Sequence, residues 1–482
     1  MKARLLATLV AEENRKWWTL GAVAFGLFMI MLDNTVVNVA LPTMQKDLHV
    51  STPRLEWIVV AYALTFAALM ITGGKLGDLY GRRRIFIVGL VIFTLASLAC
   101  GFSSSIGFLI GARAVQGVGA ALMNPATLSI ITATFAPKER GKAIGIWAGV
   151  SALALAIGPL IGGLITQNLN WNWIFFINVP VGVVAIVVSQ LVIRESRDTS
   201  HEQSIDIPGL LTSAGFLFSL SYALIEGNQQ GWASAEILGL FGAAALFLAV
   251  FVALELRQRL PMLDLSLFRI GAFAGSNIVA MMVSLAMFGV FFFVSLYVQE
   301  ILGYSATQAG AIFLPMTVLI ILIAPIAGRF SDRVGSRWLM GGGMTLLGIS
   351  LLLYQRIGLD SNFWTLLPAL LFGGVGMAMT MSPMTSAAMG AVPIDKAGVG
   401  SGVLNSFRQV GGSLGIAVMG AIIASYAHHK PRTPGAAQDY VNGLHAALLV
   451  SAGISFGAAI VAVLLVRTRP AVERAHVAEA IA

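Results

Sequence analysis

Long apolar runs separated by short polar segments dominate the chain. A helix needs roughly 20 apolar residues to cross the hydrocarbon core of a bilayer, and the pattern contains fourteen such runs. They lie at 17–41, 54–74, 84–103, 106–134, 139–167, 172–193, 206–226, 235–256, 271–299, 305–328, 337–356, 363–391, 397–426 and 441–466. The pattern therefore predicts an all-α polytopic membrane protein with fourteen transmembrane helices. Because this number is even, both termini are expected on the same side.

The composition agrees with a membrane protein. Hydrophobic residues make up 57% of the 482 residues and charged residues only 11%, which is too little polar surface for a water-soluble protein of this size. The net charge of +8 would suggest nucleic acid as a partner of a soluble protein. Here the basic residues form short clusters between apolar runs, a pattern that indicates membrane topology instead.

The distribution of basic residues predicts the orientation. With a cytoplasmic N-terminus, 23 of the 30 Lys and Arg residues fall on the cytoplasmic side and five on the opposite side, while Arg113 and Arg408 lie inside spans. This asymmetry predicts a multi-pass protein of the inner or plasma membrane with both termini in the cytoplasm. The N-terminal segment is not expected to be a cleavable signal, because Glu12 and Glu13 interrupt its basic residues.

A polar motif recurs after the second and the tenth run. The shared positions are Gly74, Asp78, Gly81 and Arg83 in the first copy and Gly328, Asp332, Gly335 and Arg337 in the second, a constant offset of 254 residues. The repeat divides the chain into a tail (1–16), a six-helix bundle (17–193), a linker with two inserted helices (194–270), a second six-helix bundle (271–466) and a tail (467–482). Two equivalent halves that rock about a central site are typical of secondary transporters, although two copies of a merely structural bundle would give the same repeat.

Asp33 is the leading candidate for function. A carboxylate inside an apolar run costs ~3 kcal/mol or more and usually marks a functional position. At 1.5 Å per residue, Asp33 lies ~24 Å above Trp17 on the rising first span, and Arg113 lies ~10 Å below the outer surface on the descending fourth span. The two depths are comparable, so we expect an Asp33–Arg113 pair. The alternative is a permanent structural pair without a role in transport.

Several motifs together resemble a known family. They occupy 32–42 in span one, 74–84 after span two, 113–119 in span four, 158–163 in span five, 171–180 at span six and 400–412 in span thirteen. These motifs, taken together and in this order, make the sequence similar to the fourteen-span drug:proton antiporter branch of the major facilitator superfamily, the EmrB/QacA type. The resemblance covers almost the whole chain. It implies the major facilitator fold, alternating access, and efflux of small lipophilic or cationic compounds in exchange for protons, the activity of multidrug and antibiotic resistance.

The resemblance also implies roles for individual residues. Asp33 and Arg113 would couple proton movement to transport. A conformational latch after span two and its repeat would comprise Gly74, Asp78, Gly81, Arg82, Arg83 and Asp332, unless this loop is a charged turn that only enforces topology. An antiporter kink in span five would comprise Gly158, Pro159, Gly162 and Gly163, since proline kinks a helix and glycine permits close packing.

Substrate contacts are expected from polar, aromatic and methionine side chains inside the spans, although such residues often only pack. The candidates are Asn34, Tyr62, Gln116, Asn124, Phe292, Met379, Asn405, Arg408 and Gln409. The partner of Arg408 stays open among a carbonyl, Gln409 and a distant acid. Spans ten and thirteen contain no carboxylate, which favours a monovalent cation, a zwitterion or a neutral amphiphile over a dication. We interpret Glu226 and Glu300 as boundary residues, and Glu255, near Arg257 and Arg259, as structural.

Other classes of function fit the sequence less well. It contains no nucleotide-binding loop, no HExxH zinc pair and no nucleophile elbow, so we expect no enzyme, no metal and no cofactor, with the proton gradient as energy source. The expected partners are small amphiphilic substrates, protons and the lipid bilayer, without nucleic acid, and the protein is expected to function as a monomer. A dedicated exporter of one antibiotic, metabolite or lipid is the alternative within transport, and a non-transporting receptor is the alternative outside it.

Overall fold

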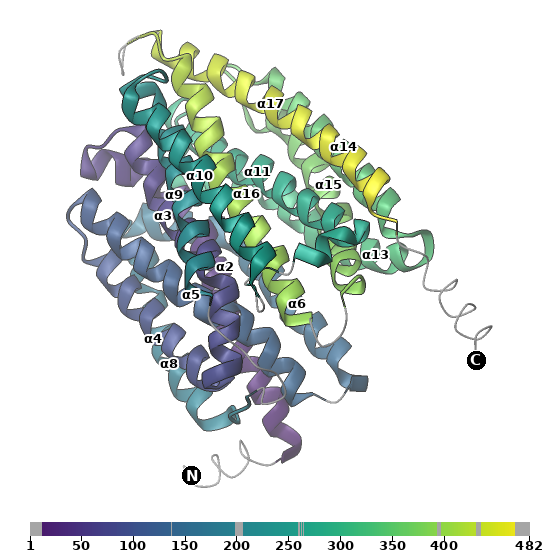
Figure 1. Cartoon of the computed structure of the whole chain (residues 1–482). Helices are drawn as coiled ribbons and strands as arrows, with labels where there is room; N and C mark the ends of the chain where they lie inside the picture. Colours follow the sequence, from purple (N-terminus) through teal and green to yellow (C-terminus); the bar gives the residue numbers. More distant parts are fainter. Residues whose placement is uncertain are drawn as a thin grey trace. The chain divides into compact units, whose positions relative to one another are not determined.

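The structure, a computed structural model, describes residues 12–135, 137–197, 206–258, 261, 263, 265–392, 397–429 and 435–467 (Figure 1). These residues are almost entirely helical, as expected for spans that must satisfy their backbone polar groups internally. Thirteen helices in the described part are long and apolar enough to cross a membrane. One more helix of 32 residues, α6, occupies the remaining predicted span, 139–167. The all-α polytopic fold is confirmed.

The first bundle contains the helices α2 to α8. Their bounds are α2 Glu12–Leu48, α3 Thr52–Tyr80, α4 Arg82–Gly101, α5 Ile106–Thr134, α6 Pro137–Asn168, α7 Trp173–Phe176 and α8 Asn178–Val192. The prediction for 106–134 coincides with α5, whereas α2 extends beyond residue 41 and includes Pro42. The predicted span 172–193 is divided at Ile177 into α7 and α8.

The inserted helices and the second bundle follow. Their bounds are α9 Ile207–Gln230, α10 Ala235–Arg257, η1 Leu265–Arg269, α11 Gly271–Glu300, α12 Ala306–Ile312, α13 Leu314–Val334, α14 Ser336–Leu353, η2 Tyr354–Arg356, α15 Phe363–Gly390, α16 Ala397–Ser425 and α17 Ala436–Leu465. The predicted span 305–328 is divided at Phe313, because Pro315 in the first turn of α13 has no N–H to continue the helix before it. The inserted helices end close to their predicted limits.

Polar residues at the predicted boundaries begin several helices. The hydroxyl of Ser105 accepts a hydrogen bond from the backbone N–H of Phe108 at the start of α5. At the start of α12, Ser305 and Gln308 form a reciprocal capping box. These side chains satisfy backbone donors that have no partner inside the helix, and they fix where the helices begin.

The chain divides into two compact units. Unit 1 comprises residues 1–217 and 246–263, and unit 2 comprises residues 218–245 and 264–482. In unit 1, α2 packs on α6, α3 packs on α5, and α4 packs on both α5 and α8. In unit 2, α11 packs on α16, α13 packs on α15, and α14 packs on both α15 and α17. The same pairings occur at equivalent positions of both bundles, so the sequence repeat corresponds to a repeat of structure.

Glycines bring α6 close to α2 in unit 1. A Cβ at Gly158 would collide with the side chain of Thr35, and a Cβ at Gly162 would lie 2.7 Å from the carbonyl oxygen of Val36. Pro159 lies inside α6 between these two contacts. The small residues predicted to form an antiporter kink therefore form the α2–α6 contact, one turn beyond Asp33 on α2.

Candidate functional site

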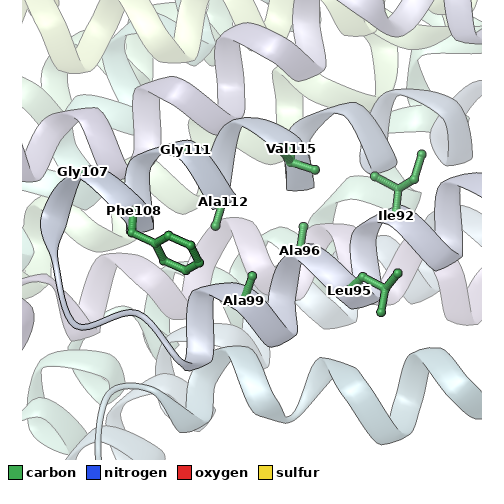
Figure 2. Close-up of a pocket in the computed structure, with 9 residues that line it drawn as sticks. All are labelled: Ile92, Leu95, Ala96, Ala99, Gly107, Phe108, Gly111, Ala112 and Val115. Carbon is green, nitrogen blue, oxygen red and sulfur yellow. The ribbon is translucent and has the colours of Figure 1, made fainter.

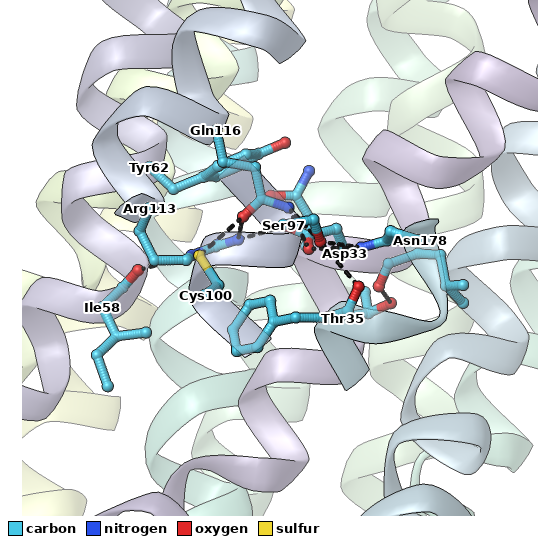
Figure 3. A network of polar contacts seen from close by, with 12 residues as sticks. Asp33, Thr35, Ile58, Tyr62, Ser97, Cys100, Arg113, Gln116 and Asn178 are labelled. Carbon is cyan, nitrogen blue, oxygen red and sulfur yellow. Dashed lines mark hydrogen bonds and ion pairs between the residues drawn. The ribbon is translucent and has the colours of Figure 1, made fainter. Parts of the chain in front are cut away.

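The carboxylate of Asp33 lies at the centre of a buried polar network in unit 1 (Figure 3). Nη1 of Arg113 donates to its Oδ2 at 2.5 Å, so the expected Asp33–Arg113 pair is present. Nε2 of Gln116 and Nδ2 of Asn178 donate to its Oδ1 at 2.9 and 3.3 Å. Side chains of α2, α3, α4, α5 and α8 contribute to the network, and three donors converge on an acceptor-only carboxylate.

The guanidinium of Arg113 is held at several points. Its Nε donates to the backbone carbonyl of Ile58 at 3.0 Å, and its Nη1 also donates to Oε1 of Gln116 at 2.7 Å. The guanidinium carbon lies 4.2 Å from the centroid of the Tyr62 ring, in the position of a cation–π contact. These partners fix the orientation of the Arg113 side chain.

Three network members were not among the predicted site residues: Ser97, Cys100 and Asn178. Oγ of Ser97 accepts from Asn178 at 3.0 Å and from Gln116 at 3.3 Å, and it donates to the carbonyl oxygen of Phe175 at 2.9 Å. The thiol of Cys100 donates weakly to Gln116 at 3.8 Å. Asn178 is a polar residue within an apolar run, and the rule that such residues find partners inside the membrane would have identified it.

The network is closed to solvent in this conformation. Asp33 and Arg113 are each 1% exposed. An ion pair that is withdrawn from water needs further hydrogen bonds, and here Gln116, Asn178 and the Ile58 carbonyl supply them. The arrangement places the Asp33 carboxylate in direct contact with a guanidinium, away from water.

The loop motif after α3 forms a second constellation of charges. Nε of Arg82 donates to Oδ1 of Asp78 at 2.8 Å, one helical turn away. The backbone N–H groups of Arg83 and Arg84 donate to the two carboxylate oxygens of Glu195 at 3.0 and 3.2 Å. Glu195, which sequence reasoning did not identify, therefore lies at the N-terminus of α4, where a negative charge is favoured by the helix dipole.

The two copies of this motif share a backbone conformation. Gly81 has φ 110° and Gly335 has φ 91°, values that side-chain-bearing residues rarely adopt. Gly74 is half-buried and lies against Pro125 of α5. The side chain of Asp332 lies outside the described residues.

The remaining substrate-binding candidates of unit 1 are dispersed. Tyr62 and Gln116 belong to the Asp33 network, and the hydroxyl of Tyr62 is buried without a hydrogen-bond partner among the described residues. Asn34 is half-buried next to Asp33 in sequence, and its carbonyl accepts from Asn38. Asn124 is buried further along α5. The structure therefore brings together only part of the predicted set.

The candidates of unit 2 fall into two groups. Phe292 is fully buried and contacts Phe293, and Met379 packs against Gly343 of α14, so both serve packing in this conformation. Asn405, Arg408 and Gln409 share one face of α16 by their helical spacing. In the described residues, Arg408 has no hydrogen-bonding or ionic partner, and Oε1 of Gln409 is a buried acceptor without a donor.

An apolar groove lies between α4 and α5 (Figure 2). Its walls include Leu95, Ala96, Ala99, Phe108 and Ala112. None of the predicted site residues lines this groove, and its lining offers no polar side chain to orient a ligand. Within the described ranges, no group of three or more His, Cys, Asp or Glu is able to hold a metal ion.

Comparison with known proteins identifies relatives over most of the chain. The family profile described as Major Facilitator Superfamily matches residues 23–292 and 276–480. The tetracenomycin C resistance and export protein of Streptomyces glaucescens is 37% identical over 413 residues, which are 86% of this chain and 77% of that protein. The multidrug resistance protein Stp of Mycobacterium tuberculosis (strain CDC 1551 / Oshkosh) is 35% identical over 411 residues, 85% of this chain and 76% of that protein.

Solved structures share the fold. The crystal structure of the POT family transporter PepTSo matches with a TM-score of 0.67 at 16% sequence identity. The match covers 94% of this chain and 97% of that chain. At this identity the likeness concerns the arrangement of helices alone.

Proposed function

Because this chain belongs to the major facilitator superfamily, we propose that its export of small molecules is driven by exchange for protons at Asp33. The protein is a multi-pass membrane transporter of the drug-efflux type and not an enzyme, in keeping with relatives named for antibiotic resistance, multidrug resistance and export. The proposal adds the energy source and the residue that binds the proton. It also places the protein in the plasma membrane, with both termini in the cytoplasm.

The enclosed ion pair of Asp33 and Arg113 is the single observation that carries the proposal. A titratable acid inside a membrane-spanning helix is costly and is expected to have a function. The guanidinium favours the charged form of the carboxylate as long as the two groups are in contact. Separating them removes this stabilisation, so a conformational change in unit 1 would change the proton affinity of Asp33.

This coupling supplies the steps of an exchange cycle. In an outward-open conformation, Arg113 withdraws and Asp33 takes up a proton from the high-proton side. In the inward-open conformation, Arg113 returns and the proton leaves to the cytoplasm. A substrate that needs the unprotonated conformation binds as the proton departs, and export then follows from the reverse rearrangement. A ligand shifts such an equilibrium only by its different affinity for the two states.

The proposed substrates are monovalent lipophilic cations, zwitterions or neutral amphiphiles. The predicted spans 305–328 and 397–426 contain no carboxylate that would neutralise a dication. The names of the relatives leave open whether the range of substrates is narrow or broad, since one is named for tetracenomycin C and another for multidrug resistance. A susceptibility panel in an efflux-deficient host separates a dedicated exporter, which protects against one compound, from a multidrug exporter, which protects against several.

The test is proton-coupled efflux by the Asp33→Asn variant in everted membrane vesicles. Asn keeps the size and the hydrogen-bonding capacity of the side chain but cannot release a proton. We expect normal membrane insertion and loss of substrate transport driven by a proton gradient. Asp360→Asn, which alters an exposed acid, is the matched control and should transport as the wild type does. Full gradient-driven transport by Asp33→Asn would refute the proposal.

A further inference from the structure

A second cluster of buried charges lies in unit 1, where the inserted helices begin and end. Asp206 immediately precedes α9, and Glu255 lies in the last turn of α10. Their exposures are only 5% and 4%. Lys75 of α3 extends to the same place, where its Nζ donates to the carbonyl oxygen of Pro261 at 3.0 Å, within electrostatic reach of both acids. Two buried acids and one half-buried base therefore lie close together.

The two carboxylates face each other across Gly209. Oδ1 of Asp206 accepts from the backbone N–H of Gly209 at 2.7 Å and from Nε2 of Gln258 at 2.9 Å. Oε2 of Glu255 accepts from the backbone N–H of Leu263 at 2.8 Å. Oδ2 of Asp206 and Oε1 of Glu255 each lie under 3.0 Å from the position that a Cβ on Gly209 would take. These two oxygens are thus no more than about 6 Å apart, a range in which like charges disfavour each other.

Glu255, which the sequence indicates as a structural residue near Arg257 and Arg259, is buried. Arg257 is exposed, whereas the Glu255 carboxylate is directed toward Asp206. Oε1 of Glu255 is a buried acceptor that receives no hydrogen bond from any described residue. An unsatisfied buried group costs about 1–3 kcal/mol, and more when it is charged. Two ionised carboxylates this close together would also repel each other.

One proton removes both penalties. Placed on either carboxyl group, it supplies a donor between Oδ2 and Oε1, and it removes the repulsion between two ionised acids. We infer that Asp206 and Glu255 bind one hydrogen ion between them and form a second proton-binding site of this protein. The ligand is the proton itself, held by a carboxylic acid–carboxylate pair beside an ammonium group.

The position of this site links it to the loop motif. Lys75 is one residue beyond Gly74 and three before Asp78, so the base of the site belongs to the first copy of the repeated motif. If the proposed function holds, the site faces the cytoplasm, where transported protons are released. Loss of its proton would place two negative charges side by side, and would weaken the attachment of the segment after α10 to the end of α3.

Infrared spectroscopy of the purified full chain in lipid nanodiscs tests the inference. A protonated carboxyl group has a carbonyl stretching band that a carboxylate lacks, and exposed Asp and Glu are ionised at neutral pH. We expect this band in the wild type at neutral pH. We expect Glu255→Gln and Asp206→Asn each to lose the same part of its intensity, because the single acid that remains is ionised opposite Lys75. Glu236→Gln, at the exposed opposite end of α10, is the control and should keep the full band.

Both test variants are designed to fold. Gln at position 255 keeps an acceptor for the N–H of Leu263, and Asn at position 206 caps a helix as well as Asp does. A further variant, Lys75→Met, should shift the midpoint of the band to higher pH, because removal of the base favours the protonated pair. Equal bands in the wild type and both acid variants, no band in the wild type, or an unchanged midpoint in Lys75→Met would each overturn the inference. These measurements need no transport, so they succeed or fail independently of proton exchange at Asp33.

Discussion

The side chain of Arg113 in unit 1 makes more contacts than an ion pair with Asp33 alone would need. Arg113 donates from Nε to a backbone carbonyl of α3 and from Nη1 to Asp33 and Gln116. Only a planar guanidinium presents donors in these directions at once, while a lysine ammonium acts as a point charge. The shape of this residue is therefore as important as its charge.

This geometry predicts the effect of Arg113→Lys. The variant keeps the positive charge but loses the simultaneous contacts to Ile58 and Asp33, so its position relative to the carboxylate is no longer fixed. We expect gradient-driven efflux to fall by about tenfold or more, because an ammonium group cannot reproduce the planar arrangement of donors of a guanidinium. Initial efflux rates in vesicles with equal protein content measure the effect. The exposed Arg467→Lys is the control, and equal rates in both variants would show that charge alone is sufficient.

Pairs of helices, rather than single helices, position the network. The α2–α6 contact depends on Gly158 and Gly162, which allow the backbone of α6 to approach Thr35 and Val36. Because Asp33 lies within one turn of these residues on α2, any separation of the two helices also displaces the carboxylate. Close approach through small residues is the principal way in which helices associate inside a membrane.

Two glycines of α6 provide a matched comparison. In Gly162→Ala, the new Cβ would lie 2.7 Å from the carbonyl oxygen of Val36, a backbone atom that cannot rotate away. We expect a loss of 1–3 kcal/mol in stability, the typical cost of overpacking. In Gly149→Ala, the Cβ would meet nothing within 4 Å, so we expect equal or higher stability. Thermal unfolding in nanodiscs distinguishes them, and similar midpoints would contradict the close α2–α6 contact.

The sequence predicts elements better than it predicts partners. Apolar length alone locates α5 and the inserted helices closely, since a span must satisfy its own backbone. The Asp33–Arg113 pair is predictable from depth along two helices. A buried partner for Asn178 is also expected from its place in an apolar run, but the identity of that partner depends on where α8 packs. The role of Glu195 is not predictable, because it depends on how the chain returns after α8 to the start of α4. The breaks at Ile177 and Phe313 likewise depend on local backbone geometry that hydropathy does not report.

At the scale of the whole molecule, the chain is a duplicated bundle with a pair of inserted helices. Equivalent helix pairs recur in units 1 and 2, and equivalent glycines with positive φ end the second helix of each bundle. A glycine with positive φ at this position turns the chain directly into the next helix in each copy. Rocking of two such units is the movement by which secondary transporters expose a site to either side.

The Asp78→Ala variant tests the role of the loop motif in this movement. Removing the carboxylate leaves Arg82 without its partner one turn away, while the Asp33 network remains intact. We expect turnover to fall roughly tenfold, the scale of a coupling free energy of 1–3 kcal/mol, with substrate affinity changed only slightly. Transport rates and equilibrium binding are measured on the same preparation. Unchanged turnover would favour a motif that only sets topology, and Asp360→Ala serves as the exposed control.

The burial of Asp33 has a practical consequence for kinetics. A carboxyl group that is 1% exposed cannot react with a carboxyl-modifying reagent such as a carbodiimide until the surrounding helices part. The labelling rate of this one side chain would therefore count openings of unit 1, without any substrate or gradient. Comparing this labelling rate with the transport rate shows how many openings the protein makes for each molecule it expels.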